Sequence, residues 1–481
     1  METIKIDDYT WEIPRGAKQG MKVPARLLAS KKLLDNIDQG VIEQITNVAC
    51  LPGIRRYALC MPDGHRGYGF PIGGVAAFST RTGVISPGGI GFDINCGVRM
   101  IRTNLTEKDI KPRLKELIDI LFQTVPSGVG ATGFVKLNRR EFDDMMVGGV
   151  PWALKKGYGW QSDSEFTEQR GALKGANPET VSEKAKKRGI DQIGTLGSGN
   201  HYLEIQKVDF DHGCNEELAA RFGLEQPGQI TVMIHCGSRG FGHQIGTDYL
   251  QSFGDAMKKY GINTHDRELA CAPFDSPEGQ AYYGAMAAAA NAAFVNRQVI
   301  MHRVREGFAK IFGKSAEELW MHLVYDVAHN IAKIEKYETE QGLEELLVHR
   351  KGATRAFGPG HPDLPSKYRE IGQPVLVGGS MQTGSYLLLG TAKAQSTTFG
   401  STLHGAGRTM SRTAATKKVR GEQVRTEMAS QGITVRTASM RGLAEEAGFA
   451  YKDVDEVVGA VHNLGISKKV AHLVPLANIK G

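Results

Sequence analysis

The chain of 481 residues lacks most features of secreted, membrane-spanning or simple zinc-binding proteins. It has only six cysteines, and the absence of C-x-x-C pairs argues against a disulfide framework and against a zinc ribbon. No run of about 18 apolar residues is present that could cross a membrane. The N-terminus carries both charge signs and has no apolar segment of the secretory type. We therefore expect a cytoplasmic protein with no membrane partner and with mostly buried free thiols.

Two nucleotide-handling signatures are also missing. There is no G-x-x-x-x-G-K-[ST] loop, which makes P-loop chemistry unlikely to operate here, and no K-x-D-G lysine motif of ordinary nucleotidyl-transferring ligases. A covalent nucleotide would therefore need another nucleophile. A neutral imidazole can attack an α-phosphate, and the resulting phosphoramidate transfers readily. His404, followed by Gly405-Ala406-Gly407, has a suitable setting for that role.

Glycine is abundant, and linkers are absent. The 59 glycines are about 12% of the chain against a usual ~7%, and they lie at turns rather than in repeats. Because no Pro/Ser-rich linker separates the motifs, we predict one large interwoven domain over residues 1–481. Periodicity predicts strands at 75–79, 82–85, 229–235 and 373–380, and helices at 111–124, 279–312 and 411–430.

Five motifs made of metal-binding or nucleophilic residues and small neighbours are spread along the chain. Thiolate, carboxylate and neutral imidazole all donate electron pairs to divalent metals, and glycine lets the backbone bring them close. Any single histidine is more often structural than catalytic, but five such motifs together predict a catalytic metal centre. The motifs are Asp93-Ile94-Asn95-Cys96-Gly97, Gly199-Asn200-His201, His235-Cys236-Gly237-Ser238-Arg239-Gly240, Ala328-His329-Asn330 and His404-Gly405-Ala406-Gly407.

The net charge of +7 is moderate, but the cations cluster beside these motifs. Runs of Lys and Arg occur at 184–188, 349–355 and 408–425, where they could guide a polyanion to the centre. For the last run, a solvated face of an exposed helix is an equally good interpretation.

The motifs carry a specific family resemblance over essentially the whole chain. The sequence resembles the RtcB family of RNA ligases, and its length and C-terminal ending resemble the archaeal members. This resemblance implies an α+β fold with mixed β-sheets, surrounding helices and a central metal cleft. It also implies a GTP- and manganese-dependent enzyme that joins RNA 2',3'-cyclic phosphate or 3'-phosphate ends to 5'-hydroxyl ends, as in tRNA splicing and RNA repair. The motifs that carry it begin at Met61-Pro62-Asp63-Gly64-His65, Gly91-Phe92-Asp93, Gly197-Ser198-Gly199, His235-Cys236-Gly237 and His404-Gly405-Ala406.

Roles follow from this resemblance by motif. Cys96 would bridge two Mn²⁺ ions, with His235 and His329 completing one site and Asp93 and His201 the other. His404 would be guanylylated and then pass GMP to the RNA 3' end. The guanine nucleotide would lie against a set of residues that also includes some metal ligands: Asn200, His201, Tyr202, Leu203, Glu204, His329, Asn330, Gly378, Gly379, Ser380, Met381, Ser385, His404, Gly405, Ala406, Gly407, Tyr451 and Lys480.

Partners and secondary roles are less closely tied to motifs. The resemblance implies broken RNA ends, including tRNA exon halves, as substrate and an archease-like activating protein as partner. Glu204 would select guanine. Asp63 and His65 more often fit an orienting role than direct catalysis, and Asp63 could orient His404. As binders of the RNA terminal phosphate we nominate residues that lie beside the motifs: Arg239, Lys351, Arg408 and Arg412.

Four alternatives stay open at this stage. Ligand softness alone favours zinc over manganese, so the choice of manganese rests on the resemblance. Cys236, where the family more often has Thr, adds a second thiol that could ligate metal. A two-metal phosphohydrolase or cyclic phosphodiesterase would use the same cleft without GTP, and a nucleic-acid-binding scaffold would hold a closed structural metal.

Overall fold

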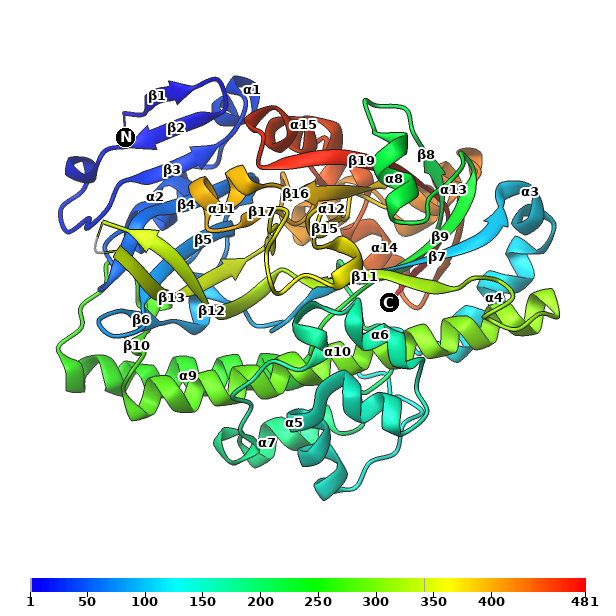
Figure 1. Ribbon diagram of the computed structural model, residues 1–481, viewed down its shortest axis with the longest axis horizontal. Coiled ribbons are helices and arrows are strands. Elements are labelled where there is room, and N and C mark those ends of the chain that lie inside the picture. Colours follow the sequence, from blue (N-terminus) through cyan, green and yellow to red (C-terminus); the bar gives the residue numbers. More distant parts are fainter. Residues whose placement is uncertain (1, 341) are drawn as a thin grey trace.

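The computed structural model describes residues 2–340 and 342–481, and two large sheets form its body (Figure 1). The first sheet has seven strands in the order β1-β2-β3-β4-β5-β13-β12, in which only β3 and β4 pair in parallel. Its strands are β1 (Ile4–Asp7), β2 (Thr10–Ile13), β3 (Ala25–Leu28), β4 (Ile54–His65), β5 (Ile72–Ser79), β12 (Asn330–Thr339) and β13 (Gly342–Lys351).

The second sheet has eight strands and is also mixed. Its order is β11-β7-β9-β8-β19-β16-β15, and β18 pairs in parallel with β19 beside this path. Its strands are β7 (Gly97–Thr106), β8 (Tyr202–Asp209), β9 (Gln229–Cys236), β11 (His322–Ala328), β15 (Pro374–Val377), β16 (Ser385–Gly390), β18 (Thr434–Thr437) and β19 (Ser467–Lys480). The chain passes from one sheet to the other between β5 and β7 and directly between β11 and β12. The two sheets are therefore interwoven in sequence.

Two small strand pairs complete the β-structure. β6 (Val84–Ile85) pairs with β10 (Ala272–Pro273), and β14 (Ala353–Arg355) pairs with β17 (Ser401–Leu403). The helices are α1 (Lys31–Asp35), α2 (Gln39–Val48), α3 (Glu107–Ile110), α4 (Leu114–Thr124), α5 (Arg139–Lys155), α6 (Gln161–Glu165), α7 (Glu183–Gly189), α8 (Glu216–Arg221), α9 (Arg239–Tyr260), α10 (Pro277–Phe312), α11 (Ala392–Thr398), α12 (Arg412–Lys418), α13 (Gly421–Ser430), α14 (Met440–Glu445) and α15 (Val454–Leu464).

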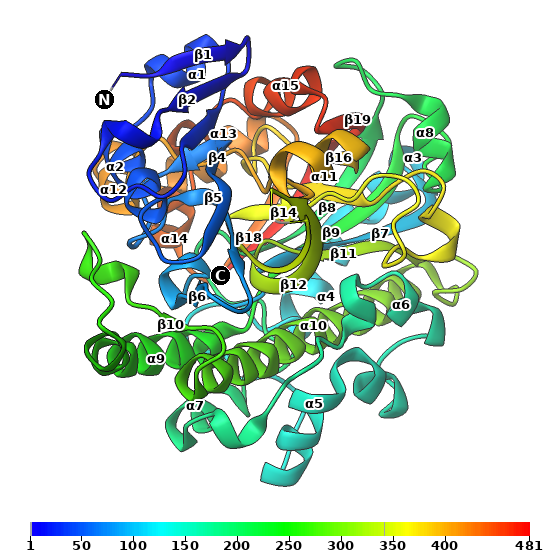
Figure 2. The same cartoon turned by 60° about the vertical axis from the view of Figure 1, so that its left-hand side comes forward.

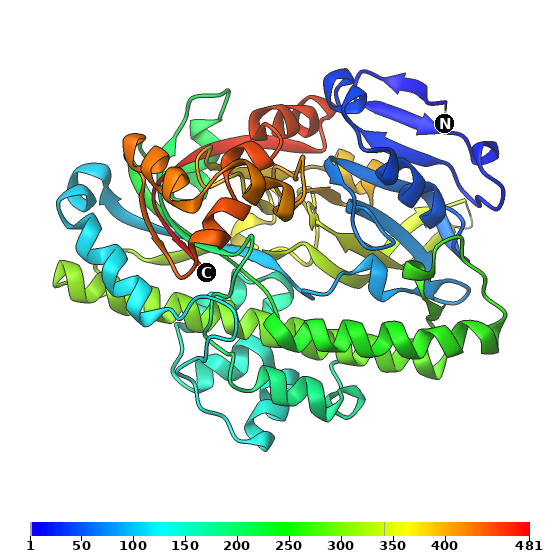
Figure 3. The same ribbon diagram turned by 180° about the vertical axis from the view of Figure 1, so that it is seen from behind.

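The long helix α10 is the central scaffold. Its Ser276 cap and Pro277 begin the helix, and Gly313, in the left-handed conformation, ends it. Its middle is buried on nearly all sides because alanines let neighbouring elements approach closely. α9 and α10 run along one side of the sheets, and α5 and α7 cover their outer side (Figures 1 and 2). Helices α12 to α14 lie on the face seen from behind (Figure 3).

The predicted elements are largely confirmed. The helix expected at 279–312 is α10, and the buried strand expected at 229–235 is β9. Three other elements are shorter than predicted. The strand expected at 373–380 ends at Val377, and the strand expected at 82–85 is only Val84–Ile85. In the helix expected at 111–124, a 3-10 turn that includes Pro112 precedes α4.

The single exposed helix expected at 411–430 is wrong. The chain forms α12 and α13 instead, because Val419 adopts an extended conformation between them. Val419 packs there against a small apolar cluster that includes Val424 and Met428. Packing of this partly buried side chain accompanies the break, which helical periodicity alone does not reveal.

The expected α+β class, with mixed sheets surrounded by helices, is confirmed. Across residues 2–340 and 342–481, none of the helices combines the length and apolar character needed to span a bilayer.

Candidate metal and nucleotide site

Strand register brings four distant motifs to one edge of the second sheet. Gly97, at the start of β7, lies opposite Cys236 at the end of β9 and opposite Ala328 at the end of β11. Tyr202, at the start of β8, lies opposite His235. Because neighbouring strands are antiparallel, the first residues of β7 and β8 lie at the same edge of the sheet as the last residues of β9 and β11. The residues that flank these positions therefore converge: Cys96, His201, His235 and His329.

The donor atoms of these side chains lie at metal-ligand spacing. Cys96 Sγ is 3.2 Å from His235 Nε2 and 3.4 Å from His201 Nε2. His235 Nε2 is 3.2 Å from His329 Nε2, and His201 Nε2 is 2.8 Å from Asp93 Oδ2. They form two triplets that share Cys96, and within each triplet the donor atoms lie within 4.8 Å of one another. Metal bonds of about 2.0–2.3 Å leave the donors of one ion roughly 3–4 Å apart. The spacing fits one cation in each triplet.

Helix α10 holds the loop that carries Cys96. The buried Arg297 guanidinium donates to the carbonyl oxygens of Asn95 and Cys236, each at 2.7 Å, and pairs with Asp326 at 2.8 Å. Asn95 has a φ of 53°, in the left-handed region, and its amide donates to the Ala290 carbonyl on α10. These bonds fix a strained turn at the candidate metal ligands, so the position of Cys96 depends on residues two hundred positions away.

The pKa values of the two histidines of the first triplet favour cation binding. Burial lowers the pKa values of His235 and His329 well below the ordinary value, and charge on neighbouring histidines lowers them further. Both imidazoles are therefore neutral, which is the form that binds metals. Burial raises the pKa of the Cys96 thiol to about 12. A bound cation would stabilise the thiolate here against the effect of burial.

His201 and Asp93 form an ion pair in the second triplet. Burial alone would lower the pKa of His201, but Cys236, Cys96 and the Asp93 carboxylate raise it well above its ordinary value. Burial would raise the pKa of Asp93, but His201 lowers it. The Leu196 carbonyl accepts from His201 Nδ1 at 3.0 Å, which directs Nε2 toward Asp93. A cation at this triplet must displace the Nε2 proton, so binding would release it.

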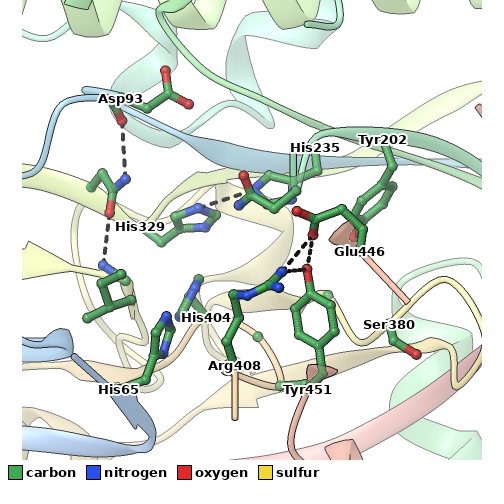
Figure 4. A pocket seen from close by; sticks show the side chains of 18 of the residues that line it. His65, Asp93, Tyr202, His235, His329, Ser380, His404, Arg408, Glu446 and Tyr451 are labelled. Carbon is green, nitrogen blue, oxygen red and sulfur yellow. Dashed lines mark hydrogen bonds and ion pairs between the residues drawn. The ribbon is translucent and has the colours of Figure 1, made fainter. Parts of the chain in front are cut away.

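Beside the cluster lies a cavity of about 400 Å³, large enough for a small ligand. Figure 4 shows His235, His329 and His404 on one side of it and Arg408, Glu446 and Tyr451 on another. Most of the expected site residues line it: Asp93, Asn200, Tyr202, His235, His329, Asn330, Lys351, Gly378, Gly379, Ser380, Met381, His404, Gly405, Ala406, Gly407, Arg408, Arg412, Tyr451 and Lys480.

Six expected residues are not part of the cavity lining. Cys96 and His201 lie in the metal cluster behind the wall, and the Leu203 side chain packs in the apolar core. Glu204 and Ser385 are buried, and the guanidinium of Arg239 lies next to His201. Any contact of Leu203 with a nucleotide would therefore go through its backbone.

His404 is held by Asp63, a residue 341 positions earlier. Asp63 Oδ2 accepts from His404 Nδ1 at 2.6 Å and from the backbone N–H groups of His404 and Gly405 at 3.0 and 3.2 Å. Burial alone would raise the pKa of Asp63, but the pairing with His404 lowers it. An ionised carboxylate only accepts hydrogen bonds, so Nδ1 of His404 carries a proton and Nε2 is the ring nitrogen that Asp63 does not engage.

A glycine is required beside this pair. Gly407 has a φ of 76°, and a Cβ there would lie 2.1 Å from the Asp63 carbonyl oxygen. Lys452 donates to the carbonyls of Pro62 and Gly64 on either side of Asp63, at 3.0 and 2.6 Å. The turn that presents Asp63 is thus fixed from both directions.

Glu204 and Lys480 lie near each other on the paired strands β8 and β19, where Glu204 is opposite Asn478. The Glu204 carboxylate accepts from the amides of Gln206 and Asn478. Burial raises the pKa of Glu204 to about 7, although Lys480 opposes the shift. Lys480 Nζ donates to the Gly199 carbonyl at 3.1 Å and lines the cavity. The register of β19 against β8, with Lys480 opposite Tyr202, places this cation at the metal edge of the sheet.

Three of the nominated RNA-phosphate cations are already engaged with protein groups. Arg408 and Arg412 pair with the two oxygens of Glu446, at 3.2 and 2.8 Å. Lys351 is buried and donates to the carbonyls of Tyr68 and Phe70. Burial lowers the pKa of Lys351 to about 7. Of the four nominees, only Arg408 and Arg412 also line a groove that continues outward from the cavity.

Sequence reasoning did not single out several residues of the cavity wall. Glu446 pairs with two arginines and accepts from the Tyr451 hydroxyl, and these groups together with Lys480 lower its pKa to about 2 against the effect of burial. Nothing in the local sequence Glu445-Glu446-Ala447 distinguishes it from a surface helix end. Tyr68 and Phe92 pack edge to face at the wall. Their nearness to the Asp63 and Asp93 motifs was the only available signal.

Comparison with known proteins agrees with this geometry. Residues 44–481 match the family described as tRNA-splicing ligase RtcB. The chain is 56% identical to the tRNA-splicing ligase RtcB of Archaeoglobus fulgidus, over 99% of this chain and 98% of the relative. It is 54% identical to the proteins of the same name from Thermococcus kodakarensis, over 99% and 98%, and Pyrobaculum aerophilum, over 99% of each chain. The chain therefore belongs to the RtcB family of tRNA-splicing ligases.

Proposed function

We propose that this protein is a GTP- and manganese-dependent RNA ligase that joins 2',3'-cyclic phosphate or 3'-phosphate ends to 5'-hydroxyl ends, in tRNA splicing and RNA repair. One observation carries the proposal beyond family membership. His404, whose Nδ1 is held by Asp63 so that Nε2 is not engaged by this carboxylate, lines the same cavity as His235 and His329 of a Cys/His/Asp cluster. A nucleophile beside two potential cation sites is the arrangement that nucleotidyl transfer requires.

The donor set supports two cations that share one thiolate. Cys96, His235 and His329 would hold one Mn²⁺, and Asp93, Cys96 and His201 the other. Bound there, divalent cations would neutralise phosphate charge and favour departure of pyrophosphate. The choice of manganese rests on the family, because softness of the ligands alone favours zinc.

His404 is proposed to attack the α-phosphate of GTP through Nε2. Asp63 accepts a hydrogen bond from the Nδ1–H group, so the ring is held in the tautomer and orientation that expose Nε2. Once Nε2 bears GMP, the ring leaves well when the RNA 3' end takes over the nucleotide, because Asp63 stabilises the positive charge on the imidazole.

The cavity wall is proposed to bind guanine nucleotide. Loop 378–381 contributes backbone groups and the Ser380 hydroxyl, and Tyr451 and Lys480 face the same space. Glu204 lies behind this wall, and we propose that it selects guanine by accepting from N1 and N2. Replacing Glu204 by Ala should then relax the preference for GTP over ATP.

RNA is proposed to enter along the groove next to the cavity. Both spaces share His65, Ile72, Arg408 and Arg412 as lining residues. The groove also presents Arg66, whose charge suits a phosphate backbone, whereas Lys32 pairs with Glu456 and Lys452 donates to the carbonyls of Pro62 and Gly64. We further propose, from the family resemblance alone, that an archease-like protein activates the enzyme.

The decisive test is labelling with α-³²P-GTP or α-³²P-ATP in the presence of Mn²⁺. We expect an acid-labile, alkali-stable label from GTP only, present in the parent and in His265→Ala, a control at an exposed histidine outside the site, and absent from His404→Ala. No label with any divalent metal would overturn the proposal and favour a metal-dependent phosphohydrolase, which needs no GTP.

A further inference from the structure

A second group of metal-binding side chains lies outside the cavity. Asp209 ends β8, His212 follows in the next loop, and His472 lies on β19. The strand register places His472 directly opposite Asp209. One potential ligand atom from each of the three residues lies within 4.8 Å of the others. Two of the three ligands are therefore fixed by neighbouring strands of the same sheet.

The buried histidine of this group has an unused nitrogen. His472 is 7% exposed, and its Nε2 lies 3.2 Å from the Thr383 carbonyl oxygen, which can only accept. Nε2 must therefore carry the proton, which leaves a lone pair on Nδ1 in the neutral ring. Nδ1 is buried without a hydrogen bond and lies 3.7 Å from Asp209 Oδ2. Two acceptors that face each other in this way are stabilised only by a positive charge between them.

The third residue closes the group from the solvent side. His212 is exposed, and its ring centroid lies 4.7 Å from that of His472. Its φ of 64° is in the left-handed region, a conformation that costs energy for a residue with a side chain. Asp455 Oδ2 lies 3.5 Å from His212 Nδ1, so a further carboxylate stands beside this imidazole. A metal ligand is often supported by a carboxylate in this way.

We propose that Asp209, His212 and His472 form a further divalent-metal site, separate from the cavity, that takes Zn²⁺ or a cation of similar softness. Two imidazoles and one carboxylate are a common zinc set, and the exposed side leaves a position for water. Mn²⁺ binds such a set more weakly than Zn²⁺ does. None of the three side chains lines the cavity, so the two kinds of site share no ligand.

The site has a structural link to the cavity wall. The Thr383 carbonyl accepts from His472, and Thr383 Oγ1 accepts from the backbone N–H of Ser380 at 3.1 Å. A cation on His472 Nδ1 strengthens the Nε2–H bond to Thr383 and so steadies the loop that includes Ser380. This consequence for nucleotide binding rests on the proposed function, whereas the existence of the metal site does not.

Equilibrium dialysis of the full-length protein against Zn²⁺, with metal counted by mass spectrometry, tests the proposal. We expect His212→Ala, an exposed substitution that leaves the core intact, to bind one zinc equivalent fewer than the parent, or to hold that equivalent at least tenfold more weakly. Asp209→Asn should do the same. His462→Ala, at an exposed histidine on α15 outside the group, should match the parent.

The opposite result is equally clear. If His212→Ala and Asp209→Asn both keep the zinc stoichiometry and affinity of the parent, the site does not exist. Guanylylation of His404 does not enter this count. Failure of the proposed ligase function would therefore leave the zinc result unchanged, and loss of the zinc difference would leave the ligase function unchanged.

Discussion

At the scale of single residues, Asp63 decides how His404 can react. Its carboxylate accepts from both the ring and the backbone of the His404 segment. We expect Asp63→Asn to lower the rate of guanylylation by at least about 100-fold, because an amide no longer holds the Nδ1–H tautomer or stabilises the charged ring. The KM for GTP and the metal content should stay close to those of the parent. If Asp63→Asn loses bound metal as well as activity, Asp63 supports the metal cluster instead.

The two adjacent cysteine candidates differ at the same scale. Cys96 belongs to both donor triplets, whereas the Cys236 thiol contacts the carbonyls of Thr195 and Leu196 and the amide of Asn296. We therefore expect Cys96→Ser to lose at least one of two manganese equivalents and Cys236→Ser to keep both. Metal analysis after dialysis measures this. Loss of an equivalent from Cys236→Ser would support a metal-binding role for that thiol.

At the scale of elements, helix α10 supports the metal edge of the sheet through Arg297. We expect Arg297→Met to lower the free energy of unfolding by about 3–5 kcal/mol, because Asp326 loses one of its two buried arginine partners. Manganese affinity should fall with it, since the Asn95 and Cys236 carbonyls lose their donor. Arg303→Met, on the same helix at a partly exposed pair with Glu306, should cost less than about 1 kcal/mol. Denaturant unfolding of both variants checks the difference.

Cation binding at this edge should depend on pH. The pKa of His201 is raised by its neighbours, so its ring is protonated in the absence of metal at neutral pH. Each cation bound at the Asp93–Cys96–His201 triplet must then release protons, and its affinity should fall as the pH falls. Manganese titrations at several pH values, with proton release measured in weak buffer, test this. An affinity independent of pH would contradict the assigned triplet.

At the scale of the whole molecule, buried ion pairs tie separate segments together. Glu168 contacts Lys333 of β12 and Arg355 of β14, at 2.7 and 2.9 Å. Burial would raise the pKa of Glu168, but these two cations lower it from 4.5 to about 2. Because the folded-state pKa is the lower one, this group contributes stability above pH 4.5 and loses that contribution as the pH falls toward 2.

The loss should be measurable in unfolding experiments. A shift of this size corresponds to about 3 kcal/mol of stability between pH 4.5 and 2. Glu168→Gln should be less stable at neutral pH, since it leaves Lys333 and Arg355 buried without their partner, and its stability should fall less steeply in that acid range. Equal acid slopes for the parent and the variant would contradict this account.

Much of this molecule is determined locally by its sequence. Ser276, Pro277 and Gly313 delimit α10, a short buried run rich in apolar and β-branched residues makes β9, and the types of donor side chain predict metal chemistry. The motifs also sufficed to predict the family, which the comparisons confirm. The single-domain boundary, the cytoplasmic location and the role of each site residue stay predictions.

Only the tertiary structure decides which of these groups meet. The pairing of Asp63 with His404, the support of Cys96 by Arg297, and the position of Glu446 between two arginines all join residues far apart in the chain. The physical reason is that residue type determines what a side chain can donate or accept, whereas strand register and helix packing determine what lies within 3 Å of it. Register depends on pairing across the whole sheet, and a local pattern of residues does not contain that information.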